Sequence, residues 1–403
     1  MAEWQTVRLG EIVKTNQSTY SPKENWQFVN YLDTGNITMN KIDEIQYINT
    51  AKDKLPSRAR RKVKTNSIIY STVRPNQLHY GVIKEQPDNF LVSTGFTVID
   101  VNYDKAVPDF IYYALTKQEV TEQLQAIAEQ SVSAYPSLKP SDIENLEFML
   151  PDKKTQERIV AILRSIDEKI KENNAINNNL LQQLDTLYDE FSHRKNWSTV
   201  IINDIAEKVA MGPFGSNIKV STFVSEGVPI ISGNHLRGYF LEEPSFNYIT
   251  EEHAQRLKNS LVYPKDIVFT HAGNIGQVAM IPDDCRYPMY VLSQRQFYLR
   301  CDTEKAIPEY VVLFFHSKQG QHELLSYANQ TGVPSIAQPA TNLKKIPLKL
   351  PPIDEQRQWL QVVSPIIKLY QSNVYENEHL SSMRDSLLPK LMSGKLDVSD
   401  IDL

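Results

Sequence analysis

Seven lysine and arginine residues are concentrated between Lys52 and Lys64, where Asp53 is the only acid. Cations at this density can neutralise nucleic-acid phosphates and release their counterions, which makes binding sensitive to salt. A solvated helix or loop face is the alternative, because most runs of charge in proteins are simply surface. The candidate phosphate contacts are Arg58, Arg60, Arg61, Lys62 and Lys64.

Polar loops supply a second group of candidates. Arginine can match the edge of guanine, and asparagine or glutamine can match the edge of adenine, through paired hydrogen bonds. One such loop follows the strand-like run Ser67–Thr72, and two more lie in the second half of the chain. The candidate base contacts are Arg74, Asn76, Gln77 and His79 in the first loop, Asn234, His235 and Arg237 in the second, and His271, Asn274 and Gln277 in the third. These loops favour reading of double-stranded DNA.

Catalytic motifs are missing from the sequence. There is no GxxxxGK[ST] phosphate loop, no GxGxxG, no Asn/Asp-Pro-Pro-aromatic tetrapeptide of an amino-methyltransferase and no HExxH. The two cysteines, Cys285 and Cys301, form neither a disulfide framework nor a CxxC zinc pair. We therefore expect a non-catalytic chain that holds no metal and no cofactor of its own.

Composition restricts the class of protein further. A chain of 403 residues is too long for one ordinary core, so two or more domains are expected. The net charge of −5 argues against coating nucleic acid over the whole surface, but a local basic face is compatible with it. No apolar run approaches the roughly 18 residues that span a bilayer, and Met1–Gly10 does not resemble a signal peptide. We expect a cytoplasmic protein that does not enter membranes.

The elements that position these residues occur twice, because segments recur at an offset of about 200 residues. The matching segments are Trp4–Ile12 with Trp197–Ile205, Ala106–Phe110 with Ala306–Tyr310, and Leu146–Pro151 with Ile346–Pro351. We therefore expect two tandem units, each a mixed domain followed by a long helix. The predicted boundaries are 1–151 and 196–351 for the domains, 152–195 for the first helix, and 352–403 for the second helix and tail.

Short β-branched runs between turns predict that each domain is α+β. The predicted strands are Ser67–Ser71, Phe96–Asp100, Asp266–Thr270 and Gln296–Arg300, and one helix is expected near the end of each domain, at Phe110–Gln130 and Tyr310–Gln330.

The long helices carry a heptad pattern typical of a coiled coil. Gln156–Phe191 contains neither glycine nor proline, and its seam runs from Ile159 to Phe191. The second helix has the equivalent seam from Trp359 to Leu391, and Pro365 is expected to kink it or displace its start. The short connection makes the helices antiparallel, which puts asparagine opposite asparagine. These register residues are Asn173 opposite Asn377, and Asn177 opposite Asn373.

The predicted seam is about 50 Å long at 1.5 Å per residue. One interpretation is a ruler that separates two recognition modules by a set distance. The other interpretation is a plain helical hairpin whose length has no functional role. The sequence leaves both interpretations open.

With these segments identified, the chain resembles the specificity subunit of type I restriction–modification systems over nearly its full length. The motifs are Gly212-Pro-Phe-Gly-Ser216, Val228 to Leu236, Asp266 to Gly276, Ser71-Thr-Val-Arg-Pro75, the junctions Pro334 to Arg357 and Leu150 to Arg158, and Leu387 to Leu396. The sequence departs from the family where its first copy lacks the Gly212–Ser216 run, and where His271 replaces a common arginine.

The resemblance implies two target-recognition domains that read a bipartite, asymmetric DNA sequence and are separated by antiparallel helices. It also implies assembly with two modification subunits, which bind S-adenosylmethionine and methylate adenine, and with restriction subunits, which use ATP and Mg²⁺. Two other functions compete with this one. A solitary DNA-modifying enzyme would need a cofactor or metal motif, and a scaffold bridging two proteins would show no salt-dependent affinity for DNA.

Overall fold

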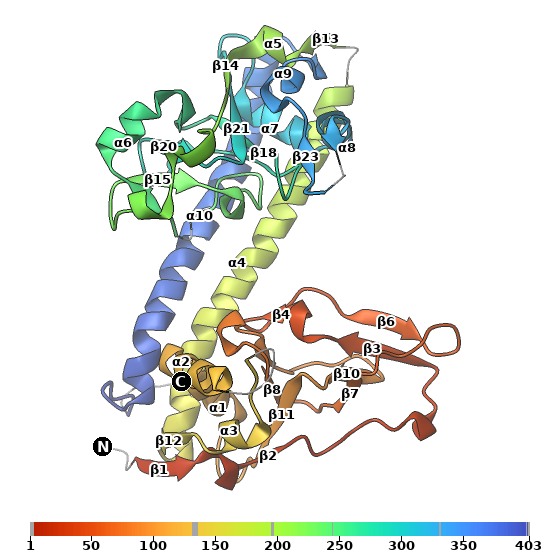
Figure 1. Ribbon diagram of the computed structural model, residues 1–403, viewed down its shortest axis with the longest axis vertical. Coiled ribbons are helices and arrows are strands. Elements are labelled where there is room, and N and C mark those ends of the chain that lie inside the picture. The colour runs from red at the N-terminus through yellow and green to blue at the C-terminus, as the bar shows by residue number, and fades with distance from the viewer. Residues whose placement is uncertain are drawn as a thin grey trace. The chain divides into compact units, whose positions relative to one another are not determined.

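The computed structural model describes residues 4–130, 136–194, 197–243, 245–329, 332–399 and 401. The chain divides into two compact units: unit 1 comprises Met1–Lys171 with His379–Leu403, and unit 2 comprises Glu172–Glu378. Each unit combines a module of strands and short helices with segments of two long helices (Figure 1). The sequence-based boundaries separate modules from helices, whereas the compact units divide both helices near their middle.

The module of unit 1 is built mainly from two four-stranded sheets. The sheet β2-β11-β8-β9 is antiparallel, and the sheet β6-β3-β10-β7 is antiparallel apart from its parallel β3–β10 pair. Its strands are β1 (Gln5–Arg8), β2 (Val13–Thr15), β3 (Phe28–Leu32), β4 (Ile37–Thr38), β5 (Lys41–Ile42), β6 (Gln46–Asn49), β7 (Ala59–Lys62), β8 (Ile68–Ser71), β9 (Tyr80–Val82), β10 (Phe90–Ser93), β11 (Phe96–Val101) and β12 (Glu147–Leu150). Its helices are α1 (Pro108–Leu115), α2 (Gln118–Glu129) and α3 (Pro140–Glu144).

The module of unit 2 repeats this plan. Its sheets β14-β21-β18-β19 and β16-β15-β20-β17 have the strand orders of their counterparts, including the parallel β15–β20 pair. Its strands are β13 (Ser198–Ile201), β14 (Ala206–Met211), β15 (Val228–Ile231), β16 (Tyr248–Ile249), β17 (Leu261–Val262), β18 (Ile267–Thr270), β19 (Val278–Met280), β20 (Tyr290–Leu292), β21 (Gln296–Cys301), β22 (Ala328–Asn329), β23 (Ser335–Ile336) and β24 (Pro347–Leu350). Its helices are α5 (Ile202–Ile205), α6 (Glu251–Arg256), α7 (Pro308–His316), α8 (Lys318–Leu325) and α9 (Pro339–Leu343). The duplicated α+β fold predicted from the repeat is therefore confirmed.

The four predicted strands correspond to β8, β11, β18 and β21, but the single helix expected near the end of each module is wrong. In each module the predicted range contains two helices, which are α1 and α2 in unit 1 and α7 and α8 in unit 2. Ser317 separates the second pair because its side chain accepts a hydrogen bond from Gly320 N (3.1 Å) and caps α8. The predicted range also extended over Ala328 and Asn329, which form strand β22, and its last residue, Gln330, lies outside the described residues.

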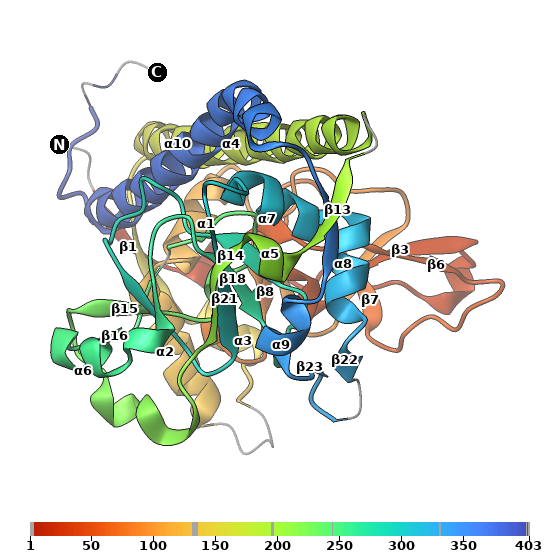
Figure 2. The same ribbon diagram turned by 90° about the horizontal axis from the view of Figure 1, so that it is seen from above.

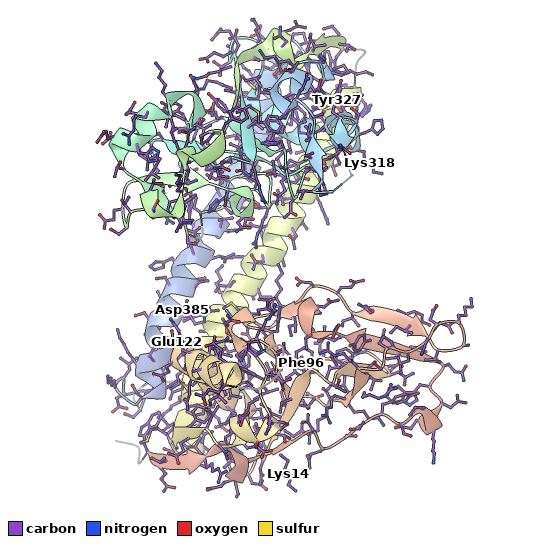
Figure 3. All side chains as sticks on the ribbon, viewed as in Figure 1. Lys14, Phe96, Glu122, Lys318, Tyr327 and Asp385 are labelled. Atoms are coloured by element: carbon purple, nitrogen blue, oxygen red, sulfur yellow. The ribbon has the colours of Figure 1, made fainter. Side chains whose placement is uncertain are left out.

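The long helices are α4 (Lys153–His193) and α10 (Ile353–Met392), which lie side by side (Figures 1 and 2). Each unit's core extends onto them: Leu163 and Leu391 join the core of unit 1, and Leu184 and Trp359 join that of unit 2. Burial of apolar surface by both helix segments thus fixes each module on its part of the helix pair. Figure 3 draws the side chains of both modules and labels Phe96, the buried first residue of β11 in unit 1.

Of the two alternative effects expected of Pro365, a displaced start of the second helix is wrong, and a kink at the proline stays a prediction. Helix α10 begins at Ile353 and continues through the proline without interruption. Pro365 and Gln361 are both exposed, so water can satisfy the Gln361 carbonyl that proline deprives of its intrahelical donor.

The asparagines of the seam pair across the helices of unit 2, as the antiparallel connection requires. Asn173 Nδ2 donates to Asn377 Oδ1 at 3.0 Å, and Asn373 Nδ2 donates to Asn177 Oδ1 at 2.8 Å. Three of the four are buried, at 1%, 6% and 7% exposure for Asn173, Asn177 and Asn373. A shift of one helix along the other would leave buried amides without partners, so these pairs favour one register.

A double-mutant cycle tests this pairing. Asn177→Leu or Asn373→Leu alone is expected to lower the free energy of unfolding of unit 2 by about 1–3 kcal/mol, because the remaining amide stays buried and loses its partner across the helices. The double variant should recover most of that loss, since two leucines pack together in a coiled-coil seam. Urea unfolding of the four proteins measures the coupling, with Asn178→Leu, at an exposed position of α4, as control. Additive losses in the double variant would contradict the pairing.

Candidate nucleic-acid interface

The first recognition loop, Thr72–His79, connects β8 and β9 in unit 1 and is fastened by main-chain hydrogen bonds. Thr72 N donates to Gly95 O at 2.8 Å, and Arg74 N donates to Pro136 O at 3.2 Å. The loop is thus attached on one side to the turn before β11 and on the other to the segment before α3. Its backbone is ordered before any ligand arrives.

The equivalent loop of unit 2, His271–Gln277, connects β18 and β19 and is held by equivalent main-chain hydrogen bonds. His271 N donates to Arg295 O, and Gly273 N donates to Pro334 O, both at 2.9 Å. The same backbone framework therefore presents different side chains in the two modules.

The side chains of the first loop are available to a ligand to different degrees. Arg74, Asn76 and Gln77 are exposed. His79 is half-buried, and its Nδ1 donates to the Ile37 carbonyl at 2.6 Å, so one ring nitrogen is already engaged.

His235 is the clearest wrong prediction among the base-contact candidates. It is only 5% exposed, its Nδ1 accepts from Ser232 N (2.9 Å), and its Nε2 donates to Ser245 O (2.8 Å). The ring stacks on Phe246 with 4.4 Å between centroids, and burial lowers its pKa. Because both nitrogens and one face are occupied, His235 is a structural residue that orders the loop after β15. Its neighbours Asn234 and Arg237 are exposed.

In the other loop of unit 2, Asn274 is exposed and its two companions are partly engaged. His271 is half-buried, and its Nε2 donates to Gln294 O at 3.1 Å. Gln277 is half-buried, and its Oε1 accepts from Thr270 Oγ1 at 3.2 Å. Asn274 is therefore the most accessible of these three candidates.

The basic cluster of unit 1 is not the uniform exposed face that its composition suggests. Arg60, Arg61 and Lys62 lie in β7 and are half-buried. Arg61 Nε is buried without a hydrogen-bond partner. Lys62 pairs with Glu24, and hydrogen bonds from Lys62 and from the Ser21 backbone lower the pKa of that carboxyl.

Arg58 and Lys64 are the two exposed members among the five candidates of this cluster. Lys64 also lies 3.5 Å from Asp100, but at 66% side-chain exposure such a pair is worth little. Position relative to the strand accounts for the mixture, because the three half-buried cations lie within β7, whereas Arg58 and Lys64 lie just outside it.

Two residues beside the second loop escaped the sequence reasoning. Gln294 and Arg295 are exposed in the turn between β20 and β21, and Gln294 donates a hydrogen bond to Gly215 O. That bond links the turn to the Gly212–Ser216 loop, in which Phe214 is 70% exposed. Gly212 is required there because a Cβ would overlap the Ser293 carbonyl oxygen. The sequence signal for this turn was a polar Ser-Gln-Arg-Gln run between two apolar segments.

The described residues show no catalytic metal centre and no membrane span. Among them, no three His, Cys, Asp or Glu side chains gather to hold a metal ion. Within the same part of the chain, every helix is too short or too polar to cross a membrane.

Comparison with known proteins identifies a family. Residues 1–182 and 194–380 match the type I restriction modification DNA specificity domain. The specificity subunit of the type I restriction enzyme HindI of Haemophilus influenzae is 32% identical over 188 residues, which make up 47% of this chain and 40% of that protein. The specificity subunit of the enzyme MjaIX of Methanocaldococcus jannaschii is 22% identical over 327 residues, or 74% of this chain and 71% of that protein.

Among solved structures, a type I restriction–modification S subunit from M. genitalium is similar to this chain. The TM-score is 0.54 at 14% identity, over 97% of this chain and 96% of that one. At this identity the likeness concerns the fold. It supports the arrangement of two modules with two long helices.

Proposed function

Since the chain belongs to the family of type I restriction modification DNA specificity domains, we propose that its two modules read two separate parts of one bipartite, asymmetric DNA target. The role is recognition without catalysis, as the relatives' description as specificity subunits implies. One observation carries the proposal: two modules share their strand orders and loop fastenings but present different polar side chains on the fastened loops.

The DNA contacts that we propose are the candidates that remain exposed. Phosphates would be bound by Arg58 and Lys64, and bases by the accessible loop residues. The proposed base contacts are Arg74, Asn76 and Gln77 in unit 1, and Asn234, Arg237 and Asn274 in unit 2. His79, His271 and Gln277 each retain one polar atom for a secondary contact.

The partners that we propose are two modification subunits and, in the larger complex, restriction subunits. S-adenosylmethionine would bind to the modification subunits, and ATP and Mg²⁺ to the restriction subunits, in the cytoplasm where host DNA is accessible. Exposed apolar side chains on the long helices of unit 2 support docking there, since Val362, Leu369 and Ile176 are 57%, 48% and 43% exposed.

Co-expression with the modification subunits, followed by single-molecule sequencing of host DNA for methyladenine, tests this function. We expect two short defined blocks separated by a fixed unspecified gap, methylated only when this chain is present. The matched control is the modification subunits expressed alone. An assembled complex that methylates nothing and shows no salt-dependent affinity for DNA would favour the scaffold alternative. A complex that never forms would contradict the proposed partners.

A further inference from the structure

The two fastened loops share two backbone positions with left-handed geometry. In unit 1 these are Arg74 (φ +49°) and Leu78 (φ +58°). In unit 2 they are Gly273 (φ +87°) and Gly276 (φ +88°). In both modules the first position is the third residue after the strand, and the second lies two residues before the next strand.

This geometry is unfavourable for any residue with a Cβ and neutral for glycine. Unit 2 fills both positions with glycine, so the loop frame itself does not need a side chain at either one. Leu78 is accounted for by packing, because it is partly buried against the core of unit 1. Arg74 is exposed, so burial does not explain why a strained arginine stands there.

The neighbouring turn shows the reverse exchange. Main-chain pairing places Gly95 of unit 1 and Arg295 of unit 2 at equivalent positions, since Gly95 O accepts from Thr72 N and Arg295 O accepts from His271 N. Unit 1 therefore has arginine in the loop and glycine in the turn, whereas unit 2 has glycine in the loop and arginine in the turn.

The guanidinium of Arg295 also stands beside the empty loop position. Its Nη1 lies 3.5 Å from where a Cβ on Gly273 would be. Unit 2 thus provides the Arg295 guanidinium at this corner of its framework. Unit 1 provides Arg74 from the loop and also Arg58, whose Nη2 fills the space that a Cβ on Gly95 would need.

We infer that Arg74 and Arg295 are the specificity-determining arginines of the two modules, each reading a guanine edge through its paired N–H donors. This inference rests on the proposed function and deepens it by assigning one residue to each half of the target. Backbone strain retained at an exposed position indicates a functional constraint. The loop of Arg74 is also ordered in advance, because Gln77 N donates to Arg74 O (2.9 Å) and Asn76 N to Gln125 Oε1 (3.2 Å), which limits the entropy lost on binding.

Substitution by glycine distinguishes an effect on DNA recognition from an effect on protein stability. Arg74→Gly installs the residue that unit 2 has at this position, so thermal stability should be unchanged or higher. Affinity for the cognate site should fall about 5- to 100-fold, the range expected for loss of one paired base contact. Arg295→Gly is expected to do the same for the other half of the target.

The experiment uses complexes with the modification subunits, and reads both the methylated motif and the salt dependence of DNA affinity. Each glycine variant should make one position degenerate, in a different half of the motif. Arg74→Lys should keep the wild-type salt dependence but lose base discrimination, because lysine retains the charge without the paired donors. Lys14→Ala is the charge control, since Lys14 is exposed at the margin of unit 1 (Figure 3). In the strand register Lys14 of β2 lies opposite Asp100, at the other end of β11 from the loop.

Glycine variants that keep the wild-type motif and affinity would overturn the inference, as would two variants that relax the same half. A wild-type complex that yields no bipartite motif would instead overturn the proposed function, and this inference with it.

Discussion

Replacing Gln356 by leucine is expected to lower the free energy of unfolding of unit 2 by about 2–4 kcal/mol. Gln356 is fully buried near the start of α10, where its side chain joins three segments. Its Nε2 donates to Pro351 O (2.7 Å) and Lys305 O (3.2 Å), and its Oε1 accepts from Ile307 N (2.9 Å). Leucine would remove all three hydrogen bonds and leave the Ile307 N–H without its acceptor.

The effect should be large because nothing within α7 can replace the lost acceptor. Ile307 caps the N-terminus of α7, so its N–H has no carbonyl partner inside that helix. Gln358→Leu, at an exposed position of the same helix, is the control and should leave stability within about 0.5 kcal/mol of wild type.

A buried glutamine makes equivalent hydrogen bonds in unit 1, so the same experiment can be made there. Gln156 is 1% exposed, accepts from Val107 N and donates to Pro151 O, both at 2.8 Å. Hydrogen exchange should therefore accelerate around α7 and β24 in Gln356→Leu, and around α1 and β12 in Gln156→Leu. A loss below about 1 kcal/mol in both variants would show that water replaces the glutamine and that the junctions are not dry.

Unit 2 is also expected to contain a proton-sensitive histidine. His316 Nε2 donates to Val278 O at 2.9 Å, its ring stacks on Tyr239 with 3.8 Å between centroids, and burial lowers its pKa to about 4. An unfolded histidine has a pKa near 6.5, so between about pH 6.5 and 4 the unfolded chain binds the proton more readily. The stability that neutral His316 contributes is complete above that window and lost as the pH falls through it.

At about 1.4 kcal/mol per pKa unit, this histidine alone removes about 3 kcal/mol by pH 4. Buried carboxyls act in the opposite direction, because burial raises the pKa of Asp185, Asp266 and Glu309. The diagnostic quantity is therefore the difference between wild type and His316→Gln in urea unfolding from pH 8 to pH 4.

The wild-type protein should lose about 3 kcal/mol more than His316→Gln over that range. His322→Gln, at an exposed position of α8, should follow the wild-type curve. Parallel curves for wild type and His316→Gln would mean that the ring is solvated in solution.

Much of this fold follows from pattern. The offset of 200 residues predicts the duplication, β-branched runs predict β8, β11, β18 and β21, and connectivity predicts the asparagine pairs. The break between α7 and α8 was missed because the apolar run up to Phe315 continues the helical pattern into Ser317. A serine capping signal was available, but it competes with that pattern.

The candidate site was predicted less well, because exposure depends on tertiary neighbours that a single sequence does not reveal. His235 resembles its neighbour Asn234 in the sequence, yet its ring is bonded to Ser245 and stacked on Phe246, ten and eleven residues farther along the chain. Arg61 resembles Arg58 in the sequence, but Arg61 lies within β7 and is half-buried, whereas Arg58 precedes the strand and is exposed. Arg295 was overlooked because the importance of its position emerges only when the two loops are compared residue by residue.

The discontinuous composition of unit 1 has a consequence for biosynthesis. Its core includes Leu391, Met392 and Val398, which follow unit 2 in the sequence and are translated after it. Unit 2, by contrast, is one uninterrupted stretch that ends at Glu378. During translation all of unit 2 is therefore synthesised before the core of unit 1 is complete. Of the two modules, the one that is synthesised first is the last that can finish folding.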